Sequence, residues 1–279
     1  MTKYRIPFNK PALVGRELQY VAEACKSGHL SGDGPFTKRC HAYLEESLGT
    51  ERALLTTSCT HALEMCALLL DLRPGDEVIV PAYAFVTTAG AFVLHGATPV
   101  FVDVRQDTLN LDESLVREQI TPRTRAIVVL HYGGVACEME AILRIAAEAG
   151  VAVVEDNAQG LFGAYHGQAL GSLGALGTTS FHETKNISAG EGGAVFVNDP
   201  QLVERSEVLR EKGTDRSKFF RGEVDKYTWV DLGSSYLPSE LTAAFLWAQL
   251  ENRHEIQETR STLWLRYREA LAPWAAEND

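Results

Sequence analysis

Short, uninterrupted runs of apolar residues recur along this chain and alternate with longer segments of helical periodicity. The runs are rich in Val, Ile and Leu and cover residues 53–55, 77–80, 99–102, 126–130 and 151–154. A strand with apolar side chains on both faces is buried on both sides, and a strand–helix–strand order favours parallel pairing. The sequence therefore predicts an α/β fold with a mostly parallel central sheet flanked by helices.

Helical patterns fill the intervening segments and both ends of the chain. They cover residues 60–70, 84–94, 112–118, 138–149 and 201–212, and residues 240–271 have the pattern of one long helix. Near the start, one helical face is formed by Val14, Leu18, Val21 and Ala22. We expect a large domain over residues 1–237, with N-terminal helices, followed by a long helix within 238–279.

Charge and composition argue against several classes of function. Lys and Arg number 26 against 37 Asp and Glu, giving a net charge of -11 that does not suit a nucleic-acid binder. The most apolar region, 89–102, is interrupted by Gly96 and Pro99 and is too short to cross a bilayer. Five cysteines without CxxC spacing predict neither a disulfide framework nor a metal site. We expect a cytoplasmic protein without a membrane or nucleic-acid partner.

Polar side chains follow the predicted strands, where ligands gather in parallel sheets. After the first strand, Ser58, Cys59 and Thr60 open a helix, and free N–H groups at a helix N-terminus bind phosphate. Ordinary helix capping would explain the same residues. After the next strand, Phe85 could stack on a planar ring, although an aromatic residue here, taken alone, is more often part of the core.

Two further positions complete the pattern. Asp156 follows the fifth run and could hold a ring nitrogen protonated, while the Gln159 amide could bond a ring hydroxyl; a helix cap or a metal ligand are the alternatives for the carboxylate. Lys185 follows the residues 178–181, which resemble another strand, and precedes a glycine-rich loop. A lysine at a buried strand end loses hydration and is a usable nucleophile toward a carbonyl. Together these groups are what pyridoxal phosphate (PLP) requires.

Five stretches carry a resemblance to a known family. They are Ser58-Cys-Thr60, Pro81-Ala-Tyr-Ala-Phe85, Glu155-Asp-Asn-Ala-Gln159, Ser180-Phe-His-Glu-Thr-Lys-Asn186 and Gly190-Glu-Gly-Gly193. The chain resembles the DegT/DnrJ/EryC1 family of fold-type I, PLP-dependent aminotransferases that act on nucleotide-linked oxo sugars. The likeness implies that Lys185 bonds the cofactor covalently, Asp156 pairs with its ring nitrogen and Phe85 stacks on the ring. It also implies a hydrogen bond from Gln159 to the ring hydroxyl and a phosphate site at Ser180, Cys59 and Thr60.

Further motifs narrow the implied reaction. Residues 216–221 and 224–229 are similar to family members that act in synthesis of the enterobacterial common antigen, a polysaccharide. This likeness implies a homodimer that moves an amino group from L-glutamate, leaving 2-oxoglutarate, to C4 of a TDP-linked 4-oxo-6-deoxy sugar. Another nucleotide-sugar 3- or 4-aminotransferase is the alternative. A sugar dehydratase of the same family would carry histidine in place of Lys185.

The likeness also bears on the C-terminal part. Family members continue into a smaller C-terminal domain that closes over the active site, whereas this sequence stops at Asp279 near the end of the predicted long helix. We therefore expect most of that small domain to be missing and apolar residues such as Leu246, Leu250 and Trp264 to lack partners. An inactive or regulatory paralogue is the non-enzyme alternative.

Overall fold

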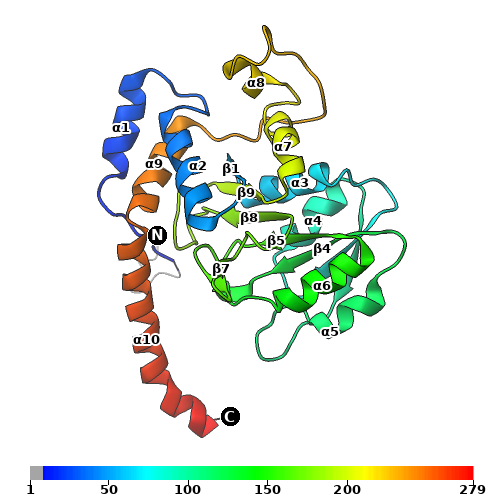
Figure 1. The fold of residues 1–279 in the computed structure, drawn as a ribbon. Helices are drawn as coiled ribbons and strands as arrows, with labels where there is room; N and C mark the ends of the chain where they lie inside the picture. The colour runs from blue at the N-terminus through cyan, green and yellow to red at the C-terminus, as the bar shows by residue number, and fades with distance from the viewer. Residues whose placement is uncertain (1–8, 279) are drawn as a thin grey trace, which may run out of the picture.

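The computed structural model describes residues 9–278 and contains a seven-stranded sheet (Figure 1). Its strand order is β1 (Arg52–Thr56), β9 (Gly193–Val197), β8 (Leu176–Ser180), β5 (Ala152–Asp156), β4 (Thr124–Leu130), β2 (Glu77–Pro81) and β3 (Thr98–Val102). All neighbouring strands pair parallel except at β9, which runs antiparallel to both β1 and β8. The predicted mostly parallel α/β sheet is confirmed.

Helices cover both faces of this sheet. Successive residues of a strand point to opposite sides, so an apolar run presents apolar side chains on both faces, and each face is buried by helices. In β2, Val78 and Val80 pack with α3 (Cys59–Leu69) and α4 (Val86–Leu94), whereas Ile79 packs on the other face with α6 (Met139–Ala149). All three side chains are fully buried. Further elements between residues 113 and 210 are α5 (Glu113–Val116), α7 (Val203–Arg210) and a hairpin formed by β6 (Ala164–Tyr165) and β7 (Gln168–Ala169).

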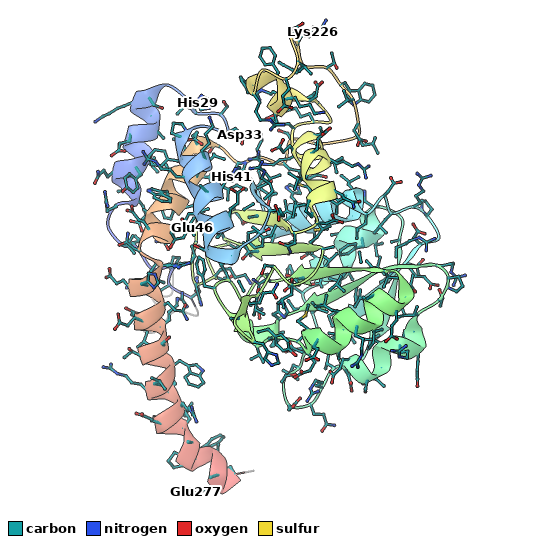
Figure 2. The ribbon with its side chains drawn as sticks, in the orientation of Figure 1. His29, Asp33, His41, Glu46, Lys226 and Glu277 are labelled. Carbon is teal, nitrogen blue, oxygen red and sulfur yellow. The ribbon has the colours of Figure 1, made fainter. Side chains whose placement is uncertain are left out.

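The segment after α7 leaves the body of the molecule as an extended loop. It includes the short helix α8 (Arg216–Phe220), and Lys226 lies at its tip (Figure 2). Aromatic side chains in this segment remain exposed, among them Phe220 and Trp229.

Two N-terminal helices, α1 (Glu17–Ser27) and α2 (Pro35–Leu48), pack against α9 (Glu240–Glu251) beside the edge of the sheet. The predicted apolar face of the first helix is only partly correct. Val14 and Val21 pack against the core, but α1 buries Glu17, Tyr20 and Ala24, while Leu18 is 80% exposed. Glu17 tolerates burial because its carboxylate accepts the N–H groups of Val14 and Gly15 and a hydrogen bond from Gln249. Glu17, which the apolar pattern leaves on the solvent-facing side of α1, is therefore a core residue.

The predicted single helix over residues 240–271 is also wrong. It is two helices, α9 and α10 (Arg253–Asn278), separated at Asn252, whose side-chain amide donates to the Ala248 carbonyl at 2.9 Å. A side chain that bonds the backbone in this way competes with the continuous helix. Beyond the break, α10 extends away from the sheet, with Glu277 at its far end (Figure 2).

The expectation that apolar residues of this region lack partners holds for only part of it. Leu246 and Leu250 are buried within the core formed with α1 and α2, whereas Trp264 on α10 is 60% exposed. The packing of α9 on the N-terminal helices explains the difference, because α10 has no such neighbour over most of its described length.

Residues 9–278 contain neither a membrane-spanning helix nor a cluster of metal-binding side chains. None of the described helices is long and apolar enough to cross a membrane. Within the same residues, His, Cys, Asp and Glu side chains form no group of three or more that could hold a metal ion.

Candidate active site

The seven side chains singled out from the sequence line a single cavity of about 480 Å³ at the carboxyl ends of the parallel strands. They are Cys59, Thr60, Phe85, Asp156, Gln159, Ser180 and Lys185. Asp156 is the last residue of β5 and Ser180 the last of β8, and α3 begins three residues after β1. Because the carboxyl ends of the parallel strands meet at one edge of the sheet, the fold brings together residues up to 126 positions apart in the chain, from Cys59 to Lys185.

The N-terminus of α3 forms one end of the cavity. Ser58 caps the helix by accepting the His61 N–H at 3.1 Å. Because Cys59 and Thr60 lie in the first turn, their N–H groups have no carbonyl within the helix to bond. Close packing beneath this turn needs a glycine, because a Cβ on Gly193 would lie 2.4 Å from the Cys59 nitrogen. Free amides and the positive end of a helix dipole suit a phosphate group.

Asp156 lies deep in the cavity, 3% exposed. The Thr88 hydroxyl donates to one carboxylate oxygen at 2.7 Å and the Ala158 N–H to the other at 3.2 Å. Burial raises the pKa of Asp156, while these two hydrogen bonds and the charge of Lys185 work in the opposite direction. A cationic ring nitrogen in the cavity would stabilise the ionised carboxylate further.

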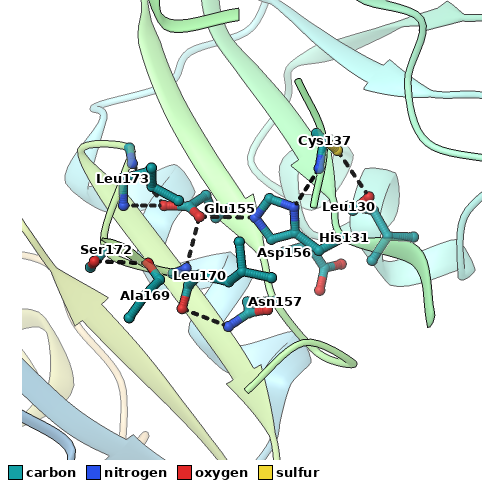
Figure 3. A network of polar contacts seen from close by, with 12 residues as sticks. Leu130, His131, Cys137, Glu155, Asp156, Asn157, Ala169, Leu170, Ser172 and Leu173 are labelled. Carbon is teal, nitrogen blue, oxygen red and sulfur yellow. Dashed lines mark hydrogen bonds and ion pairs between the residues drawn. The ribbon is translucent and has the colours of Figure 1, made fainter. Parts of the chain in front are cut away.

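The neighbouring Glu155 points to the opposite face of β5 and has a different task (Figure 3). Its carboxylate accepts the N–H groups of Gly171, Leu173 and Gly174, each at 2.7 Å, and contacts His131 Nε2 at 2.9 Å. Both Glu155 and His131 are fully buried. Glu155 therefore anchors the turn that precedes β8, which leaves Asp156 as the carboxylate facing the cavity.

Lys185 is half-buried in the loop after β8, where its backbone N–H donates to the His182 carbonyl at 2.9 Å. Gln159 is oriented by the Gly133 N–H, which donates to its side-chain oxygen at 2.6 Å. Phe85 stands at the N-cap of α4 and is 71% exposed, so it is not a core aromatic residue. Its ring is free to cover a planar group in the cavity.

The cavity lining also includes side chains that the sequence did not single out, among them Thr88 and His182. Thr88 bonds Asp156 directly, and His182 contacts the Glu191 carboxylate at 3.6 Å. The position of Thr88 one helical turn after Phe85 is a signal for the first of them, since both then face the same cavity.

The donor set fits PLP. It combines an amine, a buried carboxylate, free helix amides with a hydroxyl for a phosphate, and an exposed aromatic ring around a cavity of suitable size. An α/β fold with a mostly parallel sheet and this site defines a PLP-dependent enzyme of the aminotransferase type.

Comparison with known proteins identifies the family. Residues 11–278 match the model of the DegT/DnrJ/EryC1/StrS aminotransferase family, and the chain belongs to it. SpsC of Bacillus subtilis, a spore coat polysaccharide biosynthesis protein, is 33% identical over 269 residues, which is 95% of this chain and 69% of SpsC. The chain is accordingly a PLP-dependent sugar aminotransferase.

Solved structures agree with this assignment. An aminotransferase from Psychrobacter cryohalolentis superposes with a TM-score of 0.90 at 28% identity, covering 97% of this chain and 70% of that one. Spr1654 from Streptococcus pneumoniae, in its PLP form, gives a TM-score of 0.88 at 26% identity over 96% of this chain and 72% of Spr1654.

Proposed function

We propose that this aminotransferase moves the amino group of L-glutamate to C4 of a TDP-linked 4-oxo-6-deoxy hexose, forming a TDP-4-amino-4,6-dideoxygalactose. The structural observation that supports amino transfer to a second substrate is a pair of joined cavities. A second chamber of about 730 Å³ shares Phe85, Gln159, Ser180 and Lys185 with the cofactor cavity. A substrate in that chamber would lie directly against the reactive amine.

Each residue of the first cavity has a defined task in this proposal. PLP, when bound, supplies a carbonyl carbon that exchanges amines and a ring that withdraws electrons from the reacting carbon. The Lys185 amine would hold the cofactor covalently and, once the substrate amine has displaced it, the freed amine would move a proton at the reacting carbon. Asp156 holds the ring nitrogen protonated, and the N–H groups of Cys59 and Thr60 bind the phosphate.

The remaining contacts orient the ring. Phe85 covers one ring face, the Gln159 amide bonds the ring hydroxyl, and the Ser180 hydroxyl adds a donor to the phosphate. Hydrogen bonds from Thr88 and Ala158 fix the Asp156 carboxylate before any ligand arrives, so little reorganisation is needed on binding.

The sugar specificity is inferred from sequence motifs. The stretches 216–221 and 224–229 are similar to C4-aminating members that act in enterobacterial common antigen synthesis. SpsC, the relative compared above, is itself a polysaccharide biosynthesis protein, which supports a role in surface polysaccharide synthesis. We further propose that the enzyme works as a homodimer in the cytoplasm.

Product analysis tests this function. The PLP-loaded protein is incubated with L-glutamate and either a TDP-4-oxo-6-deoxy sugar or its 3-oxo isomer, and products are read by mass spectrometry and NMR. We expect 2-oxoglutarate and a 4-amino sugar from the first mixture, with no amination in the second. Amination of the 3-oxo isomer alone would reassign the enzyme to C3, and no amination of either sugar would contradict the proposal.

A further inference from the structure

The second chamber has an unusual charge composition for an acidic protein. Its described lining contains two cations, Lys185 and Arg253, and no carboxylate. The other polar lining side chains are neutral: Asn9, Gln159, Ser180, Thr184, Asn186 and Gln257. The cofactor cavity, in contrast, is lined by the carboxylates of Asp156 and Glu191. Of these two cavities, the second therefore offers cations and hydrogen-bond donors to a ligand without an opposing charge.

Arg253 is held in this chamber by aromatic rings. It is the first residue of α10, directly after the break at Asn252, and is half-buried. Its guanidinium carbon lies 4.4 Å from the Phe162 ring centroid and 5.2 Å from that of Tyr43. Within residues 9–278, none of the ion pairs closer than 4 Å involves this guanidinium. Contacts with ring faces fix its position, and its Nε donates to His254 Nε2 at 3.3 Å. Among the described residues, this leaves the two terminal nitrogens of the guanidinium available as donors to a ligand.

The contrast with other arginines of the chain is informative. Arg105, Arg205 and Arg221 each pair with two carboxylates at 2.6–3.7 Å. A partly desolvated guanidinium without such a partner is costly unless a ligand supplies the negative charge. The planar guanidinium fork also matches a carboxylate or a phosphate in a two-point contact.

We propose that Arg253 binds the anionic group of the substrate in this chamber; the inference rests on the proposed function. Lys185 is committed to the cofactor, so Arg253 is the remaining cation of the described lining. Both substrates of the proposed reaction are anions, one through the carboxylates of the amino donor and the other through the diphosphate of the nucleotide sugar. The shared chemistry is an oxyanion that accepts two parallel N–H bonds.

Two unreactive probes show whether the amino donor or the nucleotide sugar supplies the anionic group that Arg253 binds. Glutarate carries the carboxylates of the donor, and TDP carries the diphosphate of the acceptor. Calorimetric titration of the PLP-loaded protein with each probe gives its affinity. For Arg253→Ala we expect a loss of about tenfold or more for at least one probe, with Arg253→Lys between Ala and wild type. A loss for glutarate alone assigns the donor, a loss for TDP alone the acceptor, and a loss for both a shared site.

A matched control lies on the same helix. Arg268 stacks on the Trp264 ring at 5.5 Å from its centroid but does not line the chamber, so Arg268→Ala should bind both probes as wild type does. Wild-type affinity of Arg253→Ala for both probes, or no binding of either probe by wild type, would overturn the inference. Borohydride trapping of cofactor on each preparation distinguishes a failure of the Arg253 inference from a failure of the proposed function. Failure to label Lys185 would count against the proposed function.

Discussion

The replacement Asp156→Asn separates the catalytic task of the buried carboxylate from its structural surroundings. The amide has nearly the same size, so the cavity keeps its shape, while the negative charge opposite the ring nitrogen is lost. Asp156 is 3% exposed, and its two hydrogen-bond partners, Thr88 and Ala158, lie 2.7 and 3.2 Å away. A charge in such a site is not screened by solvent.

The Asp156→Asn replacement is expected to slow turnover. Removing one preorganised group that stabilises transition-state charge costs about 3 kcal/mol, or roughly 10²–10³-fold in kcat. Stability should move differently. Because burial raises the pKa of Asp156, the cofactor-free fold binds this proton more tightly than the unfolded chain does. Its contribution to stability therefore falls as the pH rises from the unfolded pKa, about 3.9, to the raised folded pKa.

The Asn variant has no such titration. Without cofactor, it should therefore be at least as stable as wild type near neutral pH, and only wild type should lose stability over this pH window. Urea unfolding of both cofactor-free proteins at several pH values, together with single-turnover rates of the loaded proteins, measures the two effects. Near-normal turnover of Asp156→Asn would refute the catalytic task, and a clearly less stable variant would refute the electrostatic reasoning.

Three further predictions concern buried groups. Glu155→Gln places an amide N–H₂ against backbone donors and should lower the free energy of unfolding by about 2 kcal/mol, measured in urea; an unchanged midpoint would contradict this. Glu240→Gln disrupts the acceptor for the N–H groups at the start of α2 and should cost about 1–3 kcal/mol, whereas the exposed control Glu46→Gln should cost almost nothing. Burial raises the pKa of the Cys137 thiol to about 12 and also raises the pKa of the Cys40, Cys59 and Cys66 thiols. At pH 7.5 a thiol reagent should therefore modify the native protein chiefly at the exposed Cys25, and peptide mapping would show this.

Much of the site could be predicted because the fold turns sequence position into spatial position. Residues that follow parallel strands meet at one edge of the sheet, so Cys59, Phe85, Asp156 and Lys185 share a cavity although no local pattern links them. The choice between Glu155 and Asp156 also follows from strand geometry, since adjacent side chains face opposite sides.

Other features depend on long-range contacts that local patterns do not record. Glu17 is buried because Gln249, far along the chain, meets its carboxylate, and no apolar periodicity shows this. At the break, the Asn252 side chain bonds a carbonyl in the preceding turn, a contact that the helical pattern of the sequence does not record. That break sets Arg253 in the chamber with Lys185, a juxtaposition invisible in the sequence because 68 positions separate the two.

The central claim is that Lys185 bonds the cofactor in a cavity lined by the other predicted side chains. The most direct measurement is borohydride reduction of the PLP-loaded protein, followed by proteolysis and mass mapping of the labelled peptide, with Lys185→Ala as the paired variant. The account predicts a yellow protein whose reduced cofactor maps to Lys185, and a variant that carries no covalent label. Label on a different lysine, or equal labelling of Lys185→Ala, would contradict it.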